Sequence, residues 1–180
     1  YKRLRPRSSE AHLVFVGQDQ THGRLARDIR AAGLGDHVTI TGYLGTADLE
    51  RWVQAADVIV NLRAPHVGES SGSLGYGLSA GNPVIVQPLG SWAEIPADVV
   101  VRLPVTDDDA APLADNLFAL GQDRGLRERF GAAAAAYARA QLDPHECAER
   151  LVQAAAEATT KDWYPPAWVT PTRIAAARTF

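Results

Sequence analysis

One short polar segment carries the side chains of this chain that could do chemistry. Gly68-Glu69-Ser70-Ser71-Gly72-Ser73-Leu74 sets one carboxylate among glycines and hydroxyls, and Gly81-Asn82-Pro83-Val84-Ile85-Val86 follows it. The first stretch is typical of a loop that opens a helix, and the second of a buried strand. The first N–H groups of a helix lack intrahelical partners, and the helix dipole favours negative charge there. Because a carboxylate accepts hydrogen bonds from hydroxyls, the segment predicts capture of a phosphate-bearing sugar.

Glu69 also has a purely structural interpretation. The helix dipole stabilises an acidic side chain just before a helix, so Glu69 could serve only to start the helix. Ser70 and Ser71 could cap that helix without the carboxylate. We therefore expect Glu69 to contact substrate, and we take it as the candidate catalytic residue.

Short apolar runs alternate with helical patterns along the chain. The runs lie at 12–17, 37–42, 57–62, 83–87 and 99–103. Strands that alternate with helices predict an α/β fold, here a Rossmann-like doubly wound parallel sheet with right-handed crossovers. A helix is expected over 70–80, and C-terminal helices follow from about residue 107, over 123–141 and over 144–160.

The loops after these strands are the expected site. In open parallel sheets, ligands lie beyond the carboxyl ends of the strands, so these loops should share one edge. The loops are 17–19, 42–44, 63–66, 68–73 and 90–91. They offer glycines for close backbone approach, hydroxyls and amides for polar contacts, and one clear carboxylate.

Four further residues of these loops are candidates with open alternatives. Gly17 could approach a ligand or simply form a turn. Tyr43 could contact an aromatic base or pack at the rim. Arg63 could bind phosphate or form an ion pair with Glu69. His66 fits a rim residue better than a catalyst.

Composition excludes several function classes. The 180 residues carry a net charge of −3, which gives no basic field for nucleic acid. Lys2, Arg3, Arg5 and Arg7 form a local basic cluster, which a solvated helix end or a linker would explain. The histidines are scattered away from metal-ligand spacing, so we expect no metal and no cofactor. Cys147 is the only cysteine and indicates a reducing compartment.

The chain has features of a piece of a longer protein. It contains no methionine, so Tyr1 is not a translation start. We expect one α/β domain over 1–160. The tail 161–180 contains three prolines and two tryptophans, and it is expected to strap the domain or to contact an absent N-terminal domain. No apolar run could cross a bilayer, and we expect a cytoplasmic protein with an option of peripheral contact at the inner membrane face.

From about residue 12 to 155 the chain resembles the C-terminal, donor-binding domain of family 4 (group 1) retaining glycosyltransferases of the GT-B fold. The order and spacing of several elements carry this resemblance together. They are Leu13 to Gly17, Gly33 to Tyr43, Leu49 to Val60, Gly68 to Ser73, Gly81 to Val84, Glu94 and Pro96.

The resemblance implies an enzyme that moves a sugar from a nucleotide-diphosphate sugar to an acceptor with retention, without a metal. It also implies that residues 1–160 form the nucleotide-sugar-binding domain of such an enzyme and that this domain lacks its first strand. The acceptor would be a sugar, a lipid or another small molecule. Glu69 matches the first glutamate of the family's paired-glutamate signature, which binds donor-sugar hydroxyls. The backbone of Ser71, Gly72 and Ser73 matches the turn that holds the diphosphate. The full donor-binding set is Gly17, Gly42, Tyr43, Arg63, Gly68, Ser70, Ser71, Gly72, Ser73, Leu74 and Tyr76.

The chain departs from the family pattern at the second glutamate. Tyr76 stands there when the segments are aligned on Gly81, and Gly77 stands there when the spacing is counted from Glu69. One alternative is therefore a nucleotide-sugar-binding module without turnover. A nucleotide-sugar epimerase or a phosphorylase of the same fold is another. A phosphorylase would need a lysine for its pyridoxal cofactor, but Lys2 and Lys161 are the only lysines and neither follows a strand. The isolated chain should turn over nothing, because the acceptor side lies in the partner domain.

Overall fold

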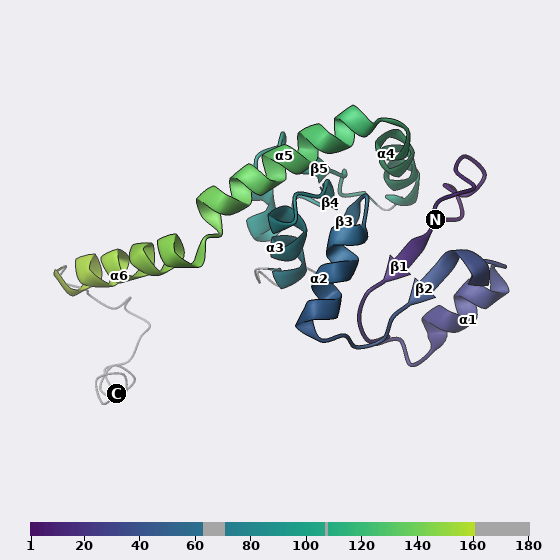
Figure 1. The fold of residues 1–180 in the computed structure, drawn as a ribbon, viewed down its shortest axis with the longest axis horizontal. Coiled ribbons are helices and arrows are strands. Elements are labelled where there is room, and N and C mark those ends of the chain that lie inside the picture. The colour runs from purple at the N-terminus through teal and green to yellow at the C-terminus, as the bar shows by residue number, and fades with distance from the viewer. Residues whose placement is uncertain (63–70, 107, 161–180) are drawn as a thin grey trace. The chain divides into compact units, whose positions relative to one another are not determined.

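The computed structural model describes residues 1–62, 71–106 and 108–160, with side chains up to Ala158. The chain divides into two compact units, Tyr1–Ala140 and Gln141–Phe180. The strands of the first unit are β1 (Leu13–Phe15), β2 (Val38–Ile40), β3 (Ile59–Asn61), β4 (Val84–Val86) and β5 (Val101–Arg102). Its α-helices are α1 (Arg24–Ala31), α2 (Thr46–Ala55), α3 (Gly72–Ser79), α4 (Ala110–Gln122) and α5 (Arg124–Gln141), which ends at the unit boundary. Two 3₁₀ turns, η1 (Gly35–His37) and η2 (Gly90–Glu94), complete the unit (Figure 1).

The alternation of strands and helices is confirmed, and the named strands of the described residues pair in parallel. The sequence predicted that the five strands form a single sheet. In the described part of the chain, hydrogen bonds instead divide them between two sheets. Among the described residues, β1 pairs with β2, and β3, β4 and β5 form a second sheet in that order. The pattern of apolar residues predicts strands but not their neighbours, because every buried parallel strand has the same kind of sequence.

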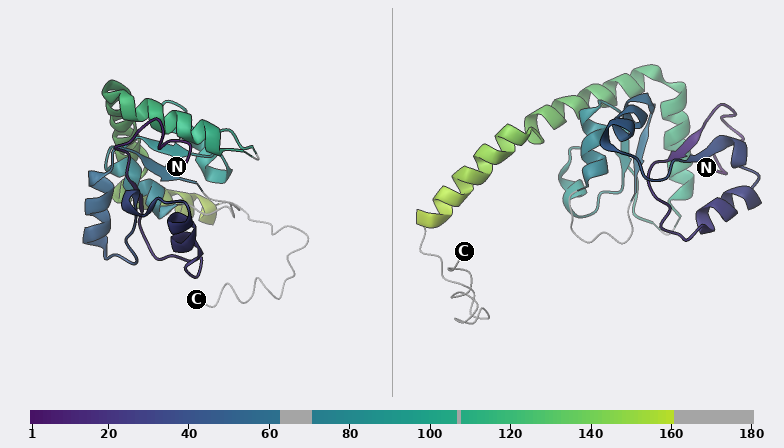
Figure 2. Two further views of the ribbon diagram at one scale, coloured as in Figure 1. Left: turned by 90° about the vertical axis from the view of Figure 1, so that its right-hand side faces the viewer. Right: turned by 60° about the horizontal axis from the view of Figure 1, so that its bottom comes forward.

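The hydrophobic core surrounds β4, whose three residues are fully buried. Val84 and Val86 pack with α3 and with the second half of α5, whereas Ile85 packs in a separate cluster with Leu120 of α4. Both faces of the β3–β4–β5 sheet are therefore covered, as a parallel sheet requires. Figure 2 shows α3, α4 and α5 gathered around these strands, with the purple and dark blue elements beside them.

The end of α3 packs very closely against α5. Asn82, which is buried, donates to the backbone oxygens of Val53 and Ala56 at 2.9 and 2.7 Å and so ties this turn to the end of α2. A Cβ on Gly131 would lie 2.2 Å from the backbone oxygen of Gly81. Only glycine at 131 allows this contact, which holds the helix of the candidate site against α5.

The second unit contains α6 (Pro144–Thr160). Asp143 starts this helix, because its Oδ1 accepts hydrogen bonds from the N–H groups of His145 and Glu146 at 2.9 and 3.1 Å. This start confirms the helix expected over 144–160. The predicted tail 161–180 lies outside the described residues.

None of the helices in the described part of the chain combines the length and the apolarity that a membrane span needs.

Candidate functional site

The start of α3 is fixed to the end of β3 by a network of three polar side chains. Asn61, the last residue of β3, is 8% exposed. Its Nδ2 donates to Ser71 Oγ at 3.1 Å, and its Oδ1 accepts from Ser73 Oγ at 3.5 Å. The two serine hydroxyls lie 2.9 Å apart. The network fixes the direction in which the first turn of α3 points.

Ser71 is the N-cap of α3. Its backbone is extended, and its Oγ accepts from the N–H of Leu74 at 3.3 Å, as N-cap serines do. Its backbone oxygen accepts from the N–H of Gly75 at 3.1 Å. The N–H groups of Gly72 and Ser73 have no partner among the described residues. Both residues are exposed, so their N–H groups and the helix dipole can receive an anion.

The ends of β1 and β2 are tied together by two glycines and a threonine. Gly17 and Gly42 form an antiparallel bridge beyond the parallel pairing. The Gly17 N–H donates to Thr41 Oγ1 at 3.2 Å, and that hydroxyl donates to the backbone oxygen of Gly42 at 2.9 Å. Both glycines have positive φ, 125° and 71°, which explains their residue type. A Cβ at either would meet nothing within 4 Å, so the backbone there is open to a ligand.

Asp19 and Thr21 order the loop that follows β1. Asp19 Oδ1 accepts from the N–H and the hydroxyl of Thr21 at 2.7 and 2.5 Å. The Thr21 hydroxyl oxygen in turn accepts from the N–H of Leu25 in the first turn of α1 at 2.8 Å. The hydrogen bonds from Thr21 lower the pKa of Asp19, because they stabilise the carboxylate.

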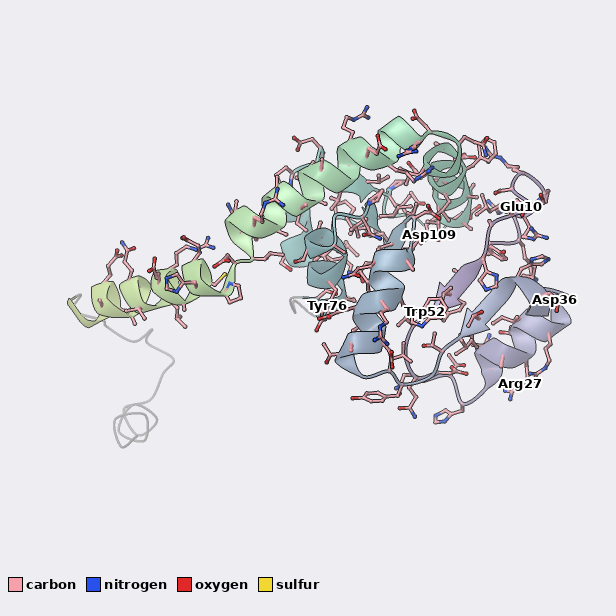
Figure 3. The ribbon with its side chains drawn as sticks, in the orientation of Figure 1. Glu10, Arg27, Asp36, Trp52, Tyr76 and Asp109 are labelled. Atoms are coloured by element: carbon pink, nitrogen blue, oxygen red, sulfur yellow. The ribbon has the colours of Figure 1, made fainter. Side chains whose placement is uncertain are left out.

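The described candidates fall into distinct environments. Figure 1 shows the loops after β1 and β2 and the start of α3 on the same, lower side of the first unit, as expected for carboxyl ends of strands. Tyr43 is 84% exposed beside Gly42, so its ring is free to contact a ligand. Tyr76, labelled in Figure 3, is 36% exposed on α3. Leu74 is buried in the core, so its side chain anchors α3.

Several predicted residues of the acidic loop lie outside the described residues, and their roles stay predictions. They are Arg63, His66, Gly68, Glu69 and Ser70.

The sequence interpretation missed Asn61 and Thr41. Asn61 is the last residue but one of the run Asp57-Val58-Ile59-Val60-Asn61-Leu62, and a buried amide near the end of an apolar strand needs partners. That requirement was a usable signal for Asn61. Thr41 lies in a strand rich in β-branched residues, where nothing marks one threonine as polar in function.

The basic cluster at the start of the chain is largely engaged within the protein. Arg3 pairs with Asp108 at 3.1 Å, and Arg7 pairs with Asp115 and lies over the ring of Phe118 at 4.2 Å. These contacts support the structural interpretation of the cluster. In the described ranges, no group of three His, Cys, Asp or Glu side chains is arranged to hold a metal ion.

Comparison with known proteins identifies the family. Residues 1–123 match the sequence pattern of the group 1 glycosyl transferases, and the chain belongs to this family. It is 36% identical over 128 residues to a phosphatidyl-myo-inositol mannosyltransferase of Mycobacterium leprae, covering 70% of this chain and 33% of that protein. It is 35% identical over 111 residues to a D-inositol 3-phosphate glycosyltransferase of an Arthrobacter strain, covering 61% and 26%. The chain thus spans a third or less of these relatives.

Solved structures show that the fold is a Rossmann-like half of a GT-B glycosyltransferase. The Anabaena protein HepE, solved in complex with UDP-glucose, superposes with a TM-score of 0.72 at 16% identity, over 83% of this chain and 42% of that one. The C-terminal domain of the group 1 glycosyl transferase LpcC from Francisella tularensis superposes with a TM-score of 0.65 at 16% identity, over 79% and 75%. The α/β class expected from the sequence is therefore confirmed.

Proposed function

We propose that this chain is the donor-binding half of a retaining glycosyltransferase that uses a nucleotide-diphosphate sugar. The single observation that carries the proposal is the start of α3, where the Asn61–Ser71–Ser73 network holds two N–H groups toward solvent. A diphosphate fits such a helix start, because N–H groups and dipole both favour negative charge. During transfer the leaving nucleotide diphosphate gains charge, and fixed donors stabilise that charge without reorganising.

The nucleobase and the sugar of the donor would bind to other residues of the same chain. The nucleobase lies beside Gly42 and Tyr43, where the backbone is open and an aromatic ring is exposed. Glu69 accepts hydrogen bonds from hydroxyls of the transferred sugar and so positions its anomeric carbon. HepE has been solved with UDP-glucose, and its likeness in fold supports a nucleotide sugar as the ligand class.

The domain division follows from the same proposal. Residues 1–160 bind the donor, and residues 161–180 pack on this domain or contact an N-terminal domain. The acceptor, which is a sugar, a lipid or another small molecule, is held by that other domain. Such a two-domain enzyme needs no metal, since N–H groups and basic side chains neutralise the leaving diphosphate.

Turnover by the full-length protein tests the role of Glu69. We expect Glu69→Ala to lower sugar transfer by about 100-fold, because a hydrogen-bonding group that positions the substrate is lost. Glu10→Ala is the matched control, because Glu10 is exposed and far along the chain from the α3 start. Unchanged transfer in Glu69→Ala would refute the assigned role.

The stereochemistry of the product tests retention separately. Proton NMR of the first product formed should show the anomeric configuration of the donor sugar. An inverted product would contradict the retaining mechanism while leaving the donor site intact.

A further inference from the structure

We propose that Asp19 recognises the nucleobase of the donor and selects guanine, so that the sugar is carried on guanosine diphosphate. The inference rests on the proposed function, because it assigns the base within the same donor site. It gives a role to a carboxylate that the proposed function leaves unused, although this carboxylate lies in one of the loops at the carboxyl ends of the strands.

Asp19 lies next to the proposed base site. The bridge between Gly17 and Gly42 holds the ends of β1 and β2 together, and the Gly17 N–H donates to Thr41 Oγ1 at 3.2 Å. Asp19 follows Gly17 by two residues, which span at most about 7 Å of chain. Tyr43 follows Gly42 on the other side of the bridge, and its ring is exposed. A base that lies against Gly42 and Tyr43 is therefore within reach of the Asp19 side chain.

The loop holds the Asp19 carboxylate in one position. Its Oδ1 accepts from the N–H and the hydroxyl of Thr21 at 2.7 and 2.5 Å. The backbone oxygen of Thr21 accepts from the N–H of Arg24 at 3.1 Å, and its hydroxyl oxygen accepts from that of Leu25 at 2.8 Å, so the loop is fastened to the start of α1. An acceptor that is fixed before its ligand arrives loses little conformational entropy on binding.

These internal contacts leave part of the carboxylate available. Both Thr21 bonds end on Oδ1, and Oδ2 keeps room for an outside donor even though the Gly23 N–H also faces the carboxylate. Within the part of the chain that the structure describes, Asp19 forms no ion pair. The loop itself does not require the charge, because an asparagine could accept the same two hydrogen bonds from Thr21. A negative charge at this place fits a ligand that presents N–H groups.

Guanine is the base whose donors suit a carboxylate. Its N1–H and its N2 amino group are neighbours on one edge, so both can point at the same carboxylate. Uracil has a single N–H, which lies between two carbonyl oxygens that a negative charge repels. Adenine offers one amino group beside a ring nitrogen that can only accept. Hydrogen bonds to an ionised acceptor are the stronger ones, so a carboxylate distinguishes these bases more sharply than a neutral amide does.

The carboxylate is kept apart from the proposed phosphate site. Asp19 follows β1, whereas the start of α3 follows β3, and these strands belong to different sheets. Figure 1 shows both places on the lower side of the first unit. A carboxylate beside the diphosphate would oppose its binding, because like charges repel. At the separate place beside Gly42 it acts on the uncharged base.

Calorimetric titration of the full-length protein with GDP, UDP and ADP tests the inference. We expect the parent protein to bind GDP at least about tenfold more tightly than UDP or ADP, because only guanine presents two donors to the charged acceptor. In Asp19→Asn, the side-chain oxygen can still accept from Thr21, and an amino group replaces Oδ2. That group donates where guanine donates, so GDP should bind about tenfold more weakly and its advantage over UDP should disappear.

Asp36→Asn is the matched control. Asp36 is exposed in η1, before β2, and so lies at the opposite end of β2 from Gly42 (Figure 3). This variant removes the same charge from the protein but changes neither loop of the base site. It should therefore keep the affinities of the parent protein for all three nucleotides. A loss of the GDP preference in both variants would overturn the inference, because net charge alone would explain it.

The remaining outcomes separate the base from the donor site. Equal affinities for the three nucleotides in the parent protein, a preference for UDP or ADP, or an unchanged GDP preference in Asp19→Asn would each overturn the assignment to Asp19, while nucleotide-diphosphate binding itself would stand. An equal loss of all three affinities in Asp19→Asn would do the same, since it would show that the residue only shapes the loop. Binding of none of the three would refute the proposed function and this inference with it.

Discussion

The side-chain amide of Asn61 donates to Ser71 Oγ at 3.1 Å and joins the last residue of β3 to the N-cap of α3. One buried residue thus sets both where the strand ends and where the helix points. The first N–H groups of α3 face solvent in a fixed direction as a result. The proposed diphosphate site depends on this relationship more than on any other described contact.

Removing the Asn61 amide should weaken both the stability of the fold and the binding of a nucleotide diphosphate, and a control variant shows whether the second effect depends on the first. We expect Asn61→Ala to lower the free energy of unfolding by about 1–3 kcal/mol, because the half-buried Ser71 hydroxyl loses the amide that donates to it. It should also weaken nucleotide-diphosphate binding by about tenfold. Asn82→Ala is the matched control, since Asn82 is equally buried but bonds to the end of α2. Urea unfolding and calorimetric titration of both variants measure the two effects, and equal binding loss in both would contradict the assignment.

Two substitutions of the N-cap residue Ser71 distinguish its role in capping α3 from the binding of an anion at the same place. Ser71→Ala should cost about 1 kcal/mol of stability, because the Leu74 N–H loses its acceptor. Ser71→Asp should keep the cap, since aspartate is as good an N-cap as serine, but it should repel a diphosphate. Thermal unfolding and titration with UDP distinguish the two variants. If Ser71→Asp binds UDP as well as the parent chain does, no phosphate lies at this helix start.

Replacing two helical glycines by alanine should change the stability in opposite directions, because only one of them lies at the contact between α5 and the end of α3. Gly131→Ala should destabilise by about 1–3 kcal/mol, because its Cβ meets the Gly81 oxygen. Gly121→Ala should stabilise by about 0.5–1 kcal/mol, because it lies within α4 and its Cβ meets nothing within 4 Å. Denaturant titrations check both. A neutral Gly131→Ala would show that the helices can separate at no cost.

Asp19 gives a pH-dependent prediction. Its pKa should lie below the ordinary value of 3.8, chiefly because the Thr21 hydroxyl donates to it. A carboxyl group whose pKa is lower in the folded state stabilises the fold above its unfolded pKa, and this contribution is lost as pH falls through the folded pKa. The start of α1 should therefore loosen only below about pH 3.8.

Thr21→Val tests the cause of that pKa shift. Carbon NMR of the Asp19 carboxyl group should show its pKa rising toward 3.8 in this variant. Thr46→Val, at the start of α2, should leave it where it was. A shift of the same size in both variants would exclude the Thr21 hydroxyl as the cause.

The order of strands and helices and the start of α3 could be predicted from the sequence. Apolar runs predict the five strands, and the small residues around Ser71 predict an N-cap, because both signals are local. The division into two sheets was beyond the sequence, since Val14 and Val60 look like ordinary buried strand residues whether or not a neighbour is present. The close approach of Gly131 to Gly81 was equally hidden, because it joins residues 50 positions apart.

The central claim is that the first N–H groups of α3 bind the diphosphate of the donor, and an NMR titration measures this directly. UDP and GDP are added to the ¹⁵N-labelled chain while the amide signals of Gly72 and Ser73 are followed, with Gly121 as a distant reference. The account predicts that the Gly72 and Ser73 signals move in a saturable manner with one of the two nucleotides, while Gly121 stays in place. If both signals stay in place when either nucleotide has saturated another part of the protein, the diphosphate binds elsewhere and the account is wrong.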